Sequence, residues 1–434
     1  MSPTASPGHP SGISERHGLF STDDSVCLGM LRTFQARLCV LMGKLLGRAR
    51  RYDSALGYFR HASDLHPESV AVQCWIGWAY QQLENHTEAL AAFERALQLK
   101  PSSAYAHAQM GRSFAFLGHY RQAVDELLRA SRIDPQYRTR REYLLALGSA
   151  HSHLQLMTES VAAYEEAYRL FPSDAEVVYH YGRALCISKR FTDAERLLRG
   201  AVSLDAKSAD AHYNLGVALG AQDKWKEAAR EFQETIILNP MRSDAHCGLG
   251  TAYKELEQFS EAANSLKEAI RLSPDDPDAY AQIGVVYSEL GQWQSAVETG
   301  KRLRQLMPDH EIGYWIMSSA YAEMERYAEA IEVTEANLEH NPNSSPAIEG
   351  LGYIYLKSGR FAEAIPVYKR AIDAHPGAAY LHVQLAEAFL GVGDIAAAAE
   401  QQTLLTSLDD SFAKELQERI RAKSPDTGAS HLTC

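Results

Sequence analysis

The sequence predicts an all-α protein built from about eleven repeated pairs of helices, because prolines, small residues and large residues recur with one period. Most steps between the recurring prolines are 34 residues, and single steps of 37 and 68 fit the same repeat. The step of 68 covers two periods, with Ala206 in place of the missing proline. The prolines are Pro67, Pro101, Pro135, Pro172, Pro240, Pro274, Pro308, Pro342 and Pro376. Alignment on this period gives eleven repeats, which start at residues 36, 70, 104, 141, 175, 209, 243, 277, 311, 345 and 379.

The small residues predict a close contact between the two helices of each repeat. Position 8 of the repeat is glycine in nine of the eleven repeats, and position 20 is alanine in ten. A glycine inside a helix costs about 1 kcal/mol relative to alanine, so its recurrence indicates that another helix passes close by. Large residues at position 11 and aromatic residues at position 17 fill the remaining space. Proline at position 32 ends the second helix, because it cannot continue the hydrogen-bond ladder.

Some repeats depart from the pattern. The bulky residue of position 24 is replaced by Gly300, Thr334 and Gln402, so we expect repeats 8, 9 and 11 to pack less well. A three-residue insertion within residues 136–140 precedes repeat 4. We expect it to shift the phase of the array, or to lengthen a helix, where repeats 3 and 4 meet.

The two ends of the chain differ from the repeats. Residues 1–26 are rich in Ser, Pro and Gly and are predicted to be a disordered leader, followed by an N-terminal cap over 27–35. The repeats occupy residues 36–412. Phe412, Leu416 and Ile420 form one apolar stripe, which predicts a C-terminal capping helix over 411–423, and residues 424–434 are predicted to be a flexible tail.

This combination of small, bulky and proline positions resembles the tetratricopeptide repeat (TPR) over residues 36–412. The resemblance implies a right-handed α-solenoid superhelix whose concave groove is lined by the first helix of each repeat, at positions 2, 5, 6, 9, 12 and 13. TPR arrays bind extended peptides or partner proteins in this groove, and the repeat carries no catalytic residues. We therefore expect a non-catalytic scaffold or adaptor for protein–protein interaction.

Two specialised TPR functions fit the sequence less well. The long array is similar to the superhelix that precedes the catalytic part of O-linked N-acetylglucosamine transferases, in which asparagines at position 6 hold the peptide backbone. Here only Asn214 matches, with Gln109, Gln282 and Gln384 as amide substitutes, and no region remains for a transferase domain. The carboxylate clamp that grips a peptide C-terminus needs Lys and Asn at set positions of neighbouring repeats, and no pair meets it.

Aromatic, amide and guanidinium groups gather at the groove positions of repeats 2 to 6, which predicts a peptide-binding surface there. The alternative is that part of this set is packed or solvated. The predicted groove residues are Trp75, Trp78, Tyr105, Gln109, Arg112, Tyr179, His180, Arg183, Tyr213 and Asn214.

Charge is segregated along the chain. Residues 1–141 have a net charge of +5 and residues 142–434 a net charge of −17. A ligand running along the groove would meet opposite fields at its two ends. The simpler interpretation is that the charge keeps an exposed solenoid soluble.

Composition and motifs exclude other functions. A net charge of −12 argues against nucleic-acid binding. Six well-separated cysteines suit a reducing compartment, so we expect a cytoplasmic protein with no metal and no cofactor. The triplets Gly-x-Gly at 248–250 and 350–352 lack the rest of a phosphate-loop fingerprint. No apolar run is long enough for an integral membrane segment.

Three alternatives stay open. The chain could be the substrate-targeting subunit of a separately encoded enzyme, such as a transferase or an envelope or secretion machine. The amphipathic stretch from Cys27 to Leu46 could lie on a membrane, although its second half also fits the register of repeat 1. The array could also self-associate through an exposed end.

Overall fold

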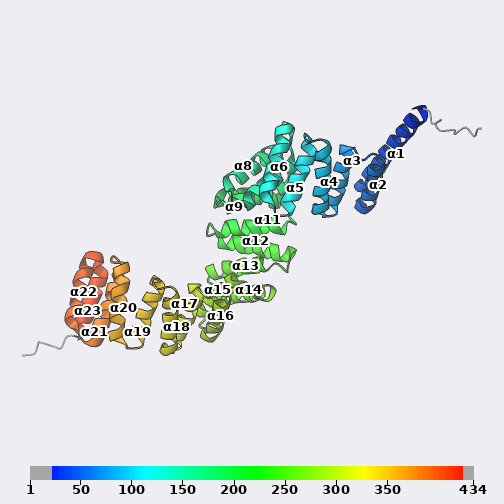
Figure 1. Cartoon of the computed structure of the whole chain (residues 1–434). Helices are drawn as coiled ribbons and strands as arrows, with labels where there is room; N and C mark the ends of the chain where they lie inside the picture. Colours follow the sequence, from blue (N-terminus) through cyan, green and yellow to red (C-terminus); the bar gives the residue numbers. More distant parts are fainter. Residues whose placement is uncertain (1–21, 424–434) are drawn as a thin grey trace, which may run out of the picture. The chain divides into compact units, whose positions relative to one another are not determined.

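The computed structural model describes residues 22–423, and this range contains 23 α-helices, one 3₁₀-helix and no strand. The chain divides between Leu204 and Asp205 into two compact parts, here called the N-terminal body and the C-terminal body (Figure 1). The helices of the N-terminal body are α1 (Thr22–Arg48), α2 (Tyr52–Leu65), α3 (Val70–Gln82), α4 (His86–Leu99), α5 (Ala104–Phe116), α6 (Tyr120–Ile133), η1 (Pro135–Thr139), α7 (Arg141–His153), α8 (Met157–Leu170), α9 (Ala175–Ile187) and α10 (Phe191–Leu204).

The C-terminal body continues the same alternation of first and second helices. Its helices are α11 (Ala209–Gly220), α12 (Trp225–Leu238), α13 (Ser243–Glu255), α14 (Phe259–Leu272), α15 (Pro277–Glu289), α16 (Trp293–Leu306), α17 (Glu311–Glu323), α18 (Tyr327–His340), α19 (Ser345–Lys357), α20 (Phe361–Ala374), α21 (Ala379–Val392), α22 (Ile395–Leu408) and α23 (Asp410–Lys423).

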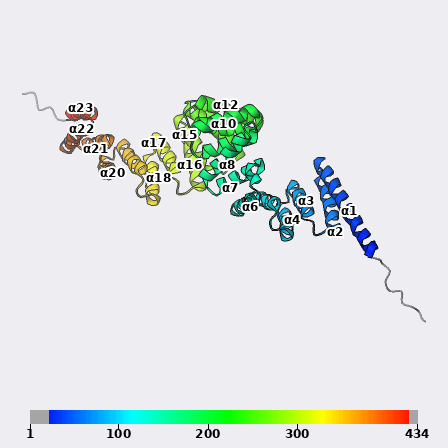
Figure 2. The ribbon, with the colours of Figure 1, turned by 90° about the horizontal axis from the view of Figure 1, so that it is seen from above.

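The predicted all-α solenoid of helix pairs is confirmed. From the second repeat onward, the first helix of every repeat begins at the residue where the proline period places the repeat start. Helix α23 follows the last pair and buries Ala413 and Leu416, and Figure 2 shows it beside α22 and α21. Within residues 22–423, no helix combines the length and apolar character needed to cross a membrane.

The first repeat differs from the others in the length of its first helix. Helix α1 starts at Thr22, so residues 22–26 and the predicted cap over 27–35 continue into the first helix of repeat 1 without a break. No proline interrupts the sequence from Thr22 to Arg48, which explains the continuity. The rest of the predicted leader, residues 1–21, and the predicted tail, 424–434, lie outside the described residues.

The glycine at position 8 makes room for the side chain at position 24 of the same repeat. A Cβ on Gly77 would lie 2.6 Å from Phe93, and one on Gly182 would lie 2.7 Å from Leu198. Phe93 and Leu198 are fully buried. In eight of the nine repeats that have this glycine, a ring or a leucine side chain at position 24 lies directly over it, and this contact fixes the spacing of the two helices.

Repeat 8 lacks the bulky residue, yet it is not loosely packed. With Gly300 at position 24, the space over Gly284 is filled by Ile316 from the next repeat. Gly300 in turn lets α17 approach, since its Cβ would lie 2.6 Å from Met317. Ile316 and Met317 are buried. The expectation of weak packing was wrong for repeat 8, because a neighbouring repeat supplies the missing volume.

The insertion before repeat 4 forms η1 and lengthens no α-helix. Asp134 accepts a hydrogen bond from the backbone N–H of Gln136 at 3.0 Å and starts this short helix. Tyr137 is buried in the core between α6 and α7, while Arg140 is exposed. The insertion thus adds a buried ring and an exposed guanidinium where repeats 3 and 4 meet.

The turn between the two helices of each repeat uses a left-handed backbone. In all eleven repeats the residue at position 15 has a positive φ, and in four of them it is glycine. The other seven are Arg50, Glu84, Gln155, Lys189, Asp223, Glu257 and Glu325. The tight turn is therefore set by the packing of the helices and not by glycine alone.

Candidate peptide-binding surfaces

The N-terminal body has two adjoining hollows on the face formed by its first helices, here called the inner face. The first, the Arg112 hollow, has a volume of about 350 Å³, and the second, the His180 hollow, has a volume of about 250 Å³. Arg112 and Glu142 line both. Helices α5 and α7 therefore form the shared wall between them.

The structure brings five of the ten predicted groove residues into these hollows. All ten are partly buried, as expected for side chains on an inner face. Trp75, Tyr179 and Arg183 lie outside the two hollows, and Tyr213 and Asn214 belong to the C-terminal body. The five that line the hollows are Trp78, Tyr105, Gln109, Arg112 and His180.

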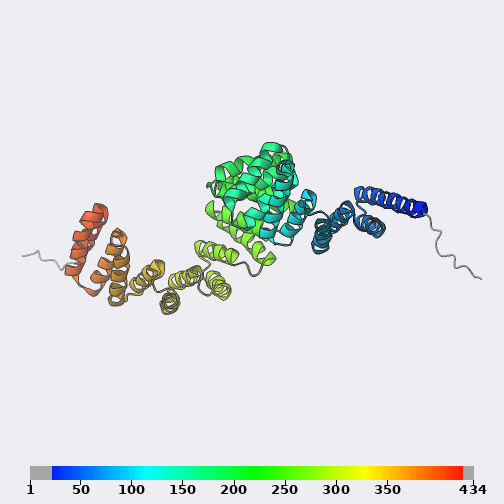
Figure 3. The ribbon, with the colours of Figure 1, turned by 45° about the horizontal axis from the view of Figure 1, so that its top comes forward.

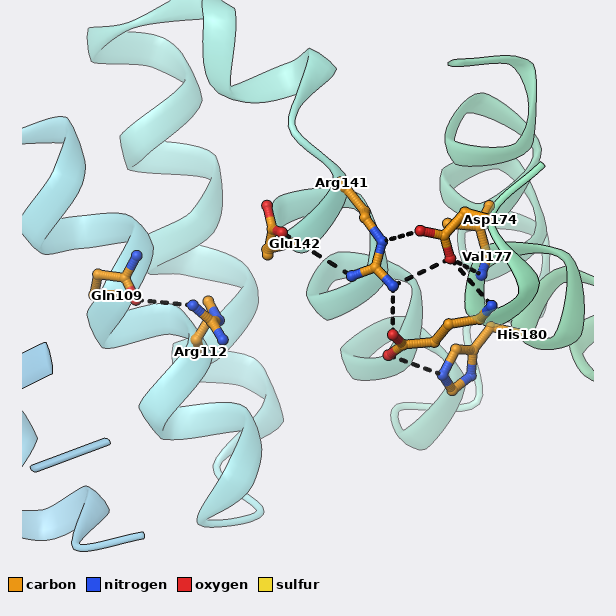
Figure 4. Close-up of polar contacts among 8 residues, drawn as sticks. Gln109, Arg112, Arg141, Glu142, Asp174, Val177 and His180 are labelled. Atoms are coloured by element: carbon orange, nitrogen blue, oxygen red, sulfur yellow. Dashed lines mark hydrogen bonds and ion pairs between the residues drawn. The ribbon is translucent and has the colours of Figure 1, made fainter. Parts of the chain in front are cut away.

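The Arg112 hollow presents two guanidinium groups that lack a carboxylate partner among the described residues. Arg112 donates to Gln109 Oε1 at 3.1 Å (Figure 4). The guanidinium of Arg140 lies over the ring of Tyr137, 4.1 Å from its centre. Glu142 is the one acidic residue in the lining. The hollow therefore carries a net positive charge with aromatic walls, which suits an acidic peptide.

The neighbouring Arg141 has the opposite role, because it is fully engaged within the protein. Its Nε donates to Asp174 at 2.6 Å, as Figure 4 shows, and it also pairs with Glu176. Asp174 in turn accepts from the backbone N–H groups of Glu176 and Val177 and caps α9. The hydrogen bond from Arg141 is the main reason that the pKa of Asp174 is lowered, and the same bond raises the pKa of Arg141. Arg141 thus fixes α7 against the start of α9.

Aromatic rings continue from the hollow toward the first repeat. Trp75 and Trp78 meet edge to face with ring centres 5.6 Å apart, and Trp75 stacks on Phe59. The ammonium group of Lys44 lies 4.6 Å from the centre of the Trp75 ring. Trp75 is therefore a packed part of the inner face that also holds a cation in place.

Tyr105 shows how deeply the Arg112 hollow reaches into the body. Burial raises the pKa of its phenol to about 12, because the phenolate would lose its hydration. Its ring packs against Phe93 and Met110. Tyr105 is therefore a partly buried ring in the lining of the hollow, as Arg112 is a partly buried guanidinium, whereas Arg140 is exposed.

The C-terminal body has a larger hollow, here called the Trp315 hollow, on the inner face of α17, α19 and α21. Its volume is about 590 Å³. Trp315, Tyr353 and Tyr380 line it, and each is between 40% and 47% exposed. Helices α17, α19 and α21, labelled in Figure 1, are the first helices of repeats 9, 10 and 11, so three successive repeats build this surface.

The Trp315 hollow exists because repeat 9 lacks the usual glycine and bulky pair. Ser318 stands at position 8 and Thr334 at position 24, and both line the hollow. Thr334 is buried and its hydroxyl donates to the carbonyl of Ala330 at 2.8 Å. Gly350 adds further space, because nothing lies within 4 Å of the place where its Cβ would be. The missing side-chain volume opens to the inner face and becomes a cavity.

This hollow is acidic. Glu311, Glu323 and Glu349 line it, and no Lys or Arg does so among the described residues. Glu349 accepts a hydrogen bond from Tyr380 at 2.8 Å, and burial together with this glutamate raises the pKa of Tyr380. Lys357 lies at 5.4 Å over the ring of Tyr353. Exposed rings next to carboxylates form a surface that suits a cationic side chain.

The rings of the Trp315 hollow lie outside the binding surface predicted from the sequence, although the groove positions of the repeat include them. Trp315, Tyr353 and Tyr380 stand at positions 5, 9 and 2 of their repeats, which are groove positions. The predicted surface is confined to repeats 2 to 6, and the loss of bulk at Thr334 predicts weak packing in repeat 9. Tyr137 and Arg140 were missed for another reason, since the insertion lies outside the repeat register.

The family comparison agrees with this architecture. A tetratricopeptide repeat model matches residues 40–104, 109–175, 182–242 and 317–379, which together make up more than half of the chain. Further TPR models match residues 250–291 and 355–410. The chain therefore belongs to the tetratricopeptide repeat family, whose members are typically non-catalytic, protein-binding scaffolds, and no enzyme family matches it.

Solved structures of other proteins are similar to parts or most of the chain. YrrB, described as a TPR protein with an unusual peptide-binding site, is 23% identical with a TM-score of 0.40, over 44% of this chain and 97% of YrrB. Yeast Tom70 is 15% identical with a TM-score of 0.39, over 89% of this chain and 95% of its own. The Cut9 complex with Hcn1 gives 13% identity and a TM-score of 0.46, over 92% and 99%. No curated protein sequence matches the chain.

Proposed function

We propose that this chain is a non-catalytic scaffold that binds an extended acidic segment of a partner protein in the Arg112 hollow. The observation that carries the proposal is the pair Arg112 and Arg140, which face a hollow with aromatic walls and have no carboxylate partner among the described residues. Two guanidinium groups held by stacking and by an amide are preorganised to bind carboxylates. A backbone or side-chain amide of the ligand would be held by Gln109.

The Trp315 hollow is proposed as a second binding surface, with a negative charge where the Arg112 hollow has a positive one. Its three glutamates and exposed rings suit a segment that carries lysine or arginine. The scaffold would then select partners by charge, with an acidic segment on the N-terminal body and a basic segment on the C-terminal body. Each surface is proposed to act by itself.

A peptide-display selection tests both surfaces on the full chain. The wild type is expected to enrich two classes of peptide, one acidic and one basic. Arg112→Glu with Arg140→Glu should remove the acidic class and leave the basic class, and about a tenfold loss of affinity is expected for isolated acidic peptides. Glu323→Lys with Glu349→Lys should have the reverse effect.

The control variant is Arg121→Glu, alone and combined with Arg132→Glu to match the charge change of the double variant, at exposed positions of α6 outside both hollows. Circular dichroism checks that all variants keep the helicity of the wild type. If Arg121→Glu removes the acidic class as well as the double variant does, net charge and not the hollow selects the peptide. If the wild type enriches no charged class, the proposal is wrong.

A further inference from the structure

Helix α1 has an apolar face that no part of the described chain covers. Its first half runs past the end of α2, as Figures 1 and 3 show. Seven large apolar side chains of α1 are exposed, and the most exposed, Met30 and Phe34, reach 69% and 66%. The set is Met30, Leu31, Phe34, Leu38, Leu41, Met42 and Leu45.

These side chains form one continuous stripe opposite the packed face of the helix. At about 100° per residue, the seven positions fall within an arc of about 120°. The packed face lies on the other side, where Ala36 is buried and where a Cβ on Gly43 or Gly47 would collide with Phe59 or Trp78. Helix α1 is therefore both the first helix of repeat 1 and a helix with a second, unpartnered apolar face.

The charge around this stripe has a single sign. From Ser25 to Tyr52 the sequence contains no Asp or Glu, and Arg37, Lys44 and Arg48 follow one edge of the stripe. Arg32, Arg50 and Arg51 add three more exposed cations. Among the described residues, none of the six forms an ion pair. The rest of the chain is acidic, since the net charge of the whole is −12.

We propose that α1 docks the scaffold on an anionic membrane surface, with the apolar stripe at the boundary of the acyl chains and the basic edge on the lipid head groups. A second copy of α1 fits the charges poorly, because it would add only cations and no salt bridge could form across the pair. The stripe is also broader than the seam of a two-stranded coiled coil, since Met30 and Met42 widen it on both sides. A lipid interface accepts such a convex stripe of Leu, Met and Phe and attracts the cations.

The acidic remainder of the chain restricts this contact to α1. An anionic surface attracts the region from Met30 to Arg51 and repels the acidic C-terminal body. None of the seven stripe residues of α1 lines the Arg112 hollow or the Trp315 hollow, so docking through α1 uses different side chains from those of the two hollows. The scaffold could therefore hold a partner and a membrane at the same time.

Vesicle co-sedimentation of the full chain tests this inference. We expect binding to phosphatidylcholine vesicles that contain phosphatidylserine, weak binding to phosphatidylcholine alone, and release by salt. Phe34→Glu with Leu41→Glu should reduce binding by at least about tenfold. Arg37→Glu with Arg48→Glu should remove the preference for phosphatidylserine. The control is Ile237→Glu, which changes a side chain of α12 that is 70% exposed and should leave binding unchanged.

Three results would overturn the inference. One is the absence of binding to either vesicle. Another is equal loss with Ile237→Glu, which would show that general surface charge controls sedimentation. The third is a stable dimer, measured by light scattering, that Leu41→Glu dissociates while vesicle binding is absent, because a second copy would then cover the stripe. Because the stripe is exposed, these variants should fold, and circular dichroism checks that they do.

Discussion

Two glycines of one helix should respond in opposite ways to the same substitution. Gly350 and Gly352 both lie in α19, and replacement by alanine gains about 1 kcal/mol of helix propensity at either site. At Gly352 the new methyl would lie 2.7 Å from Tyr368, which is 2% exposed and cannot move aside, so overpacking should cost about 1–3 kcal/mol. At Gly350 nothing lies within 4 Å. The propensity gain is common to both variants, so their difference should equal the overpacking cost.

Thermal unfolding followed by circular dichroism measures this difference. Gly350→Ala should raise the melting temperature and Gly352→Ala should give a value lower than Gly350→Ala by several degrees, since about 1 kcal/mol shifts it by roughly 2–4 °C in a body of this size. Gly350 also lines the Trp315 hollow, so its added methyl should weaken the binding of basic peptides there. Equal melting temperatures for the two variants would refute the contact between Gly352 and Tyr368.

Two further predictions concern polar contacts of the N-terminal body. Asp174→Ala should lower the free energy of unfolding by about 1–2 kcal/mol, and Asp174→Asn by less, because asparagine still caps the helix but no longer pairs with Arg141. The folded pKa of Asp174 lies below its ordinary value of 3.8. The wild type should therefore have a larger free energy of unfolding than Asp174→Asn, by a constant amount at neutral pH. Urea unfolding should show this difference disappear as the pH falls below about 3.8. Glu126→Ala should cost about 1–3 kcal/mol, because Nδ1 of the buried His107 ring would lose its partner. Glu126→Gln should cost less, because a glutamine, Gln401, pairs with the corresponding histidine, His382, in the last repeat. Equal losses of unfolding free energy for the two variants, measured in urea, would contradict this account.

The register of the helices could be predicted from the sequence because it depends on contacts within one repeat. Proline at position 32 and glycine at position 8 act on the helix that carries them and on its partner in the same pair, so the period alone placed the start of each repeat. Contacts between repeats could not be predicted in this way. Ile316 fills the space over Gly284 from the next repeat, and no alignment of one repeat with another contains that relation.

The candidate surfaces were predictable only in part. Of the predicted groove residues, Trp78, Tyr105, Gln109 and Arg112 meet in one hollow. The space that makes a hollow comes from departures from the repeat, and a period-based alignment treats these as errors. Tyr137 and Arg140 come from an insertion, and Thr334 comes from a lost bulky residue.

If departures from the repeat pattern create the binding surface, restoring the pattern in repeat 9 should remove the surface without unfolding the protein. Ser318→Gly with Thr334→Leu recreates in repeat 9 the pair formed by Gly182 and Leu198 in repeat 5. Burying leucine should gain about 1–2 kcal/mol over threonine, and glycine in the helix should cost about 1 kcal/mol, so stability should change little. The leucine would occupy the Trp315 hollow, and basic peptides should lose affinity by about tenfold in fluorescence polarisation. Unchanged affinity in a folded double variant would show that the hollow does not bind them, whereas loss of stability would show that Ser318 and Thr334 serve packing.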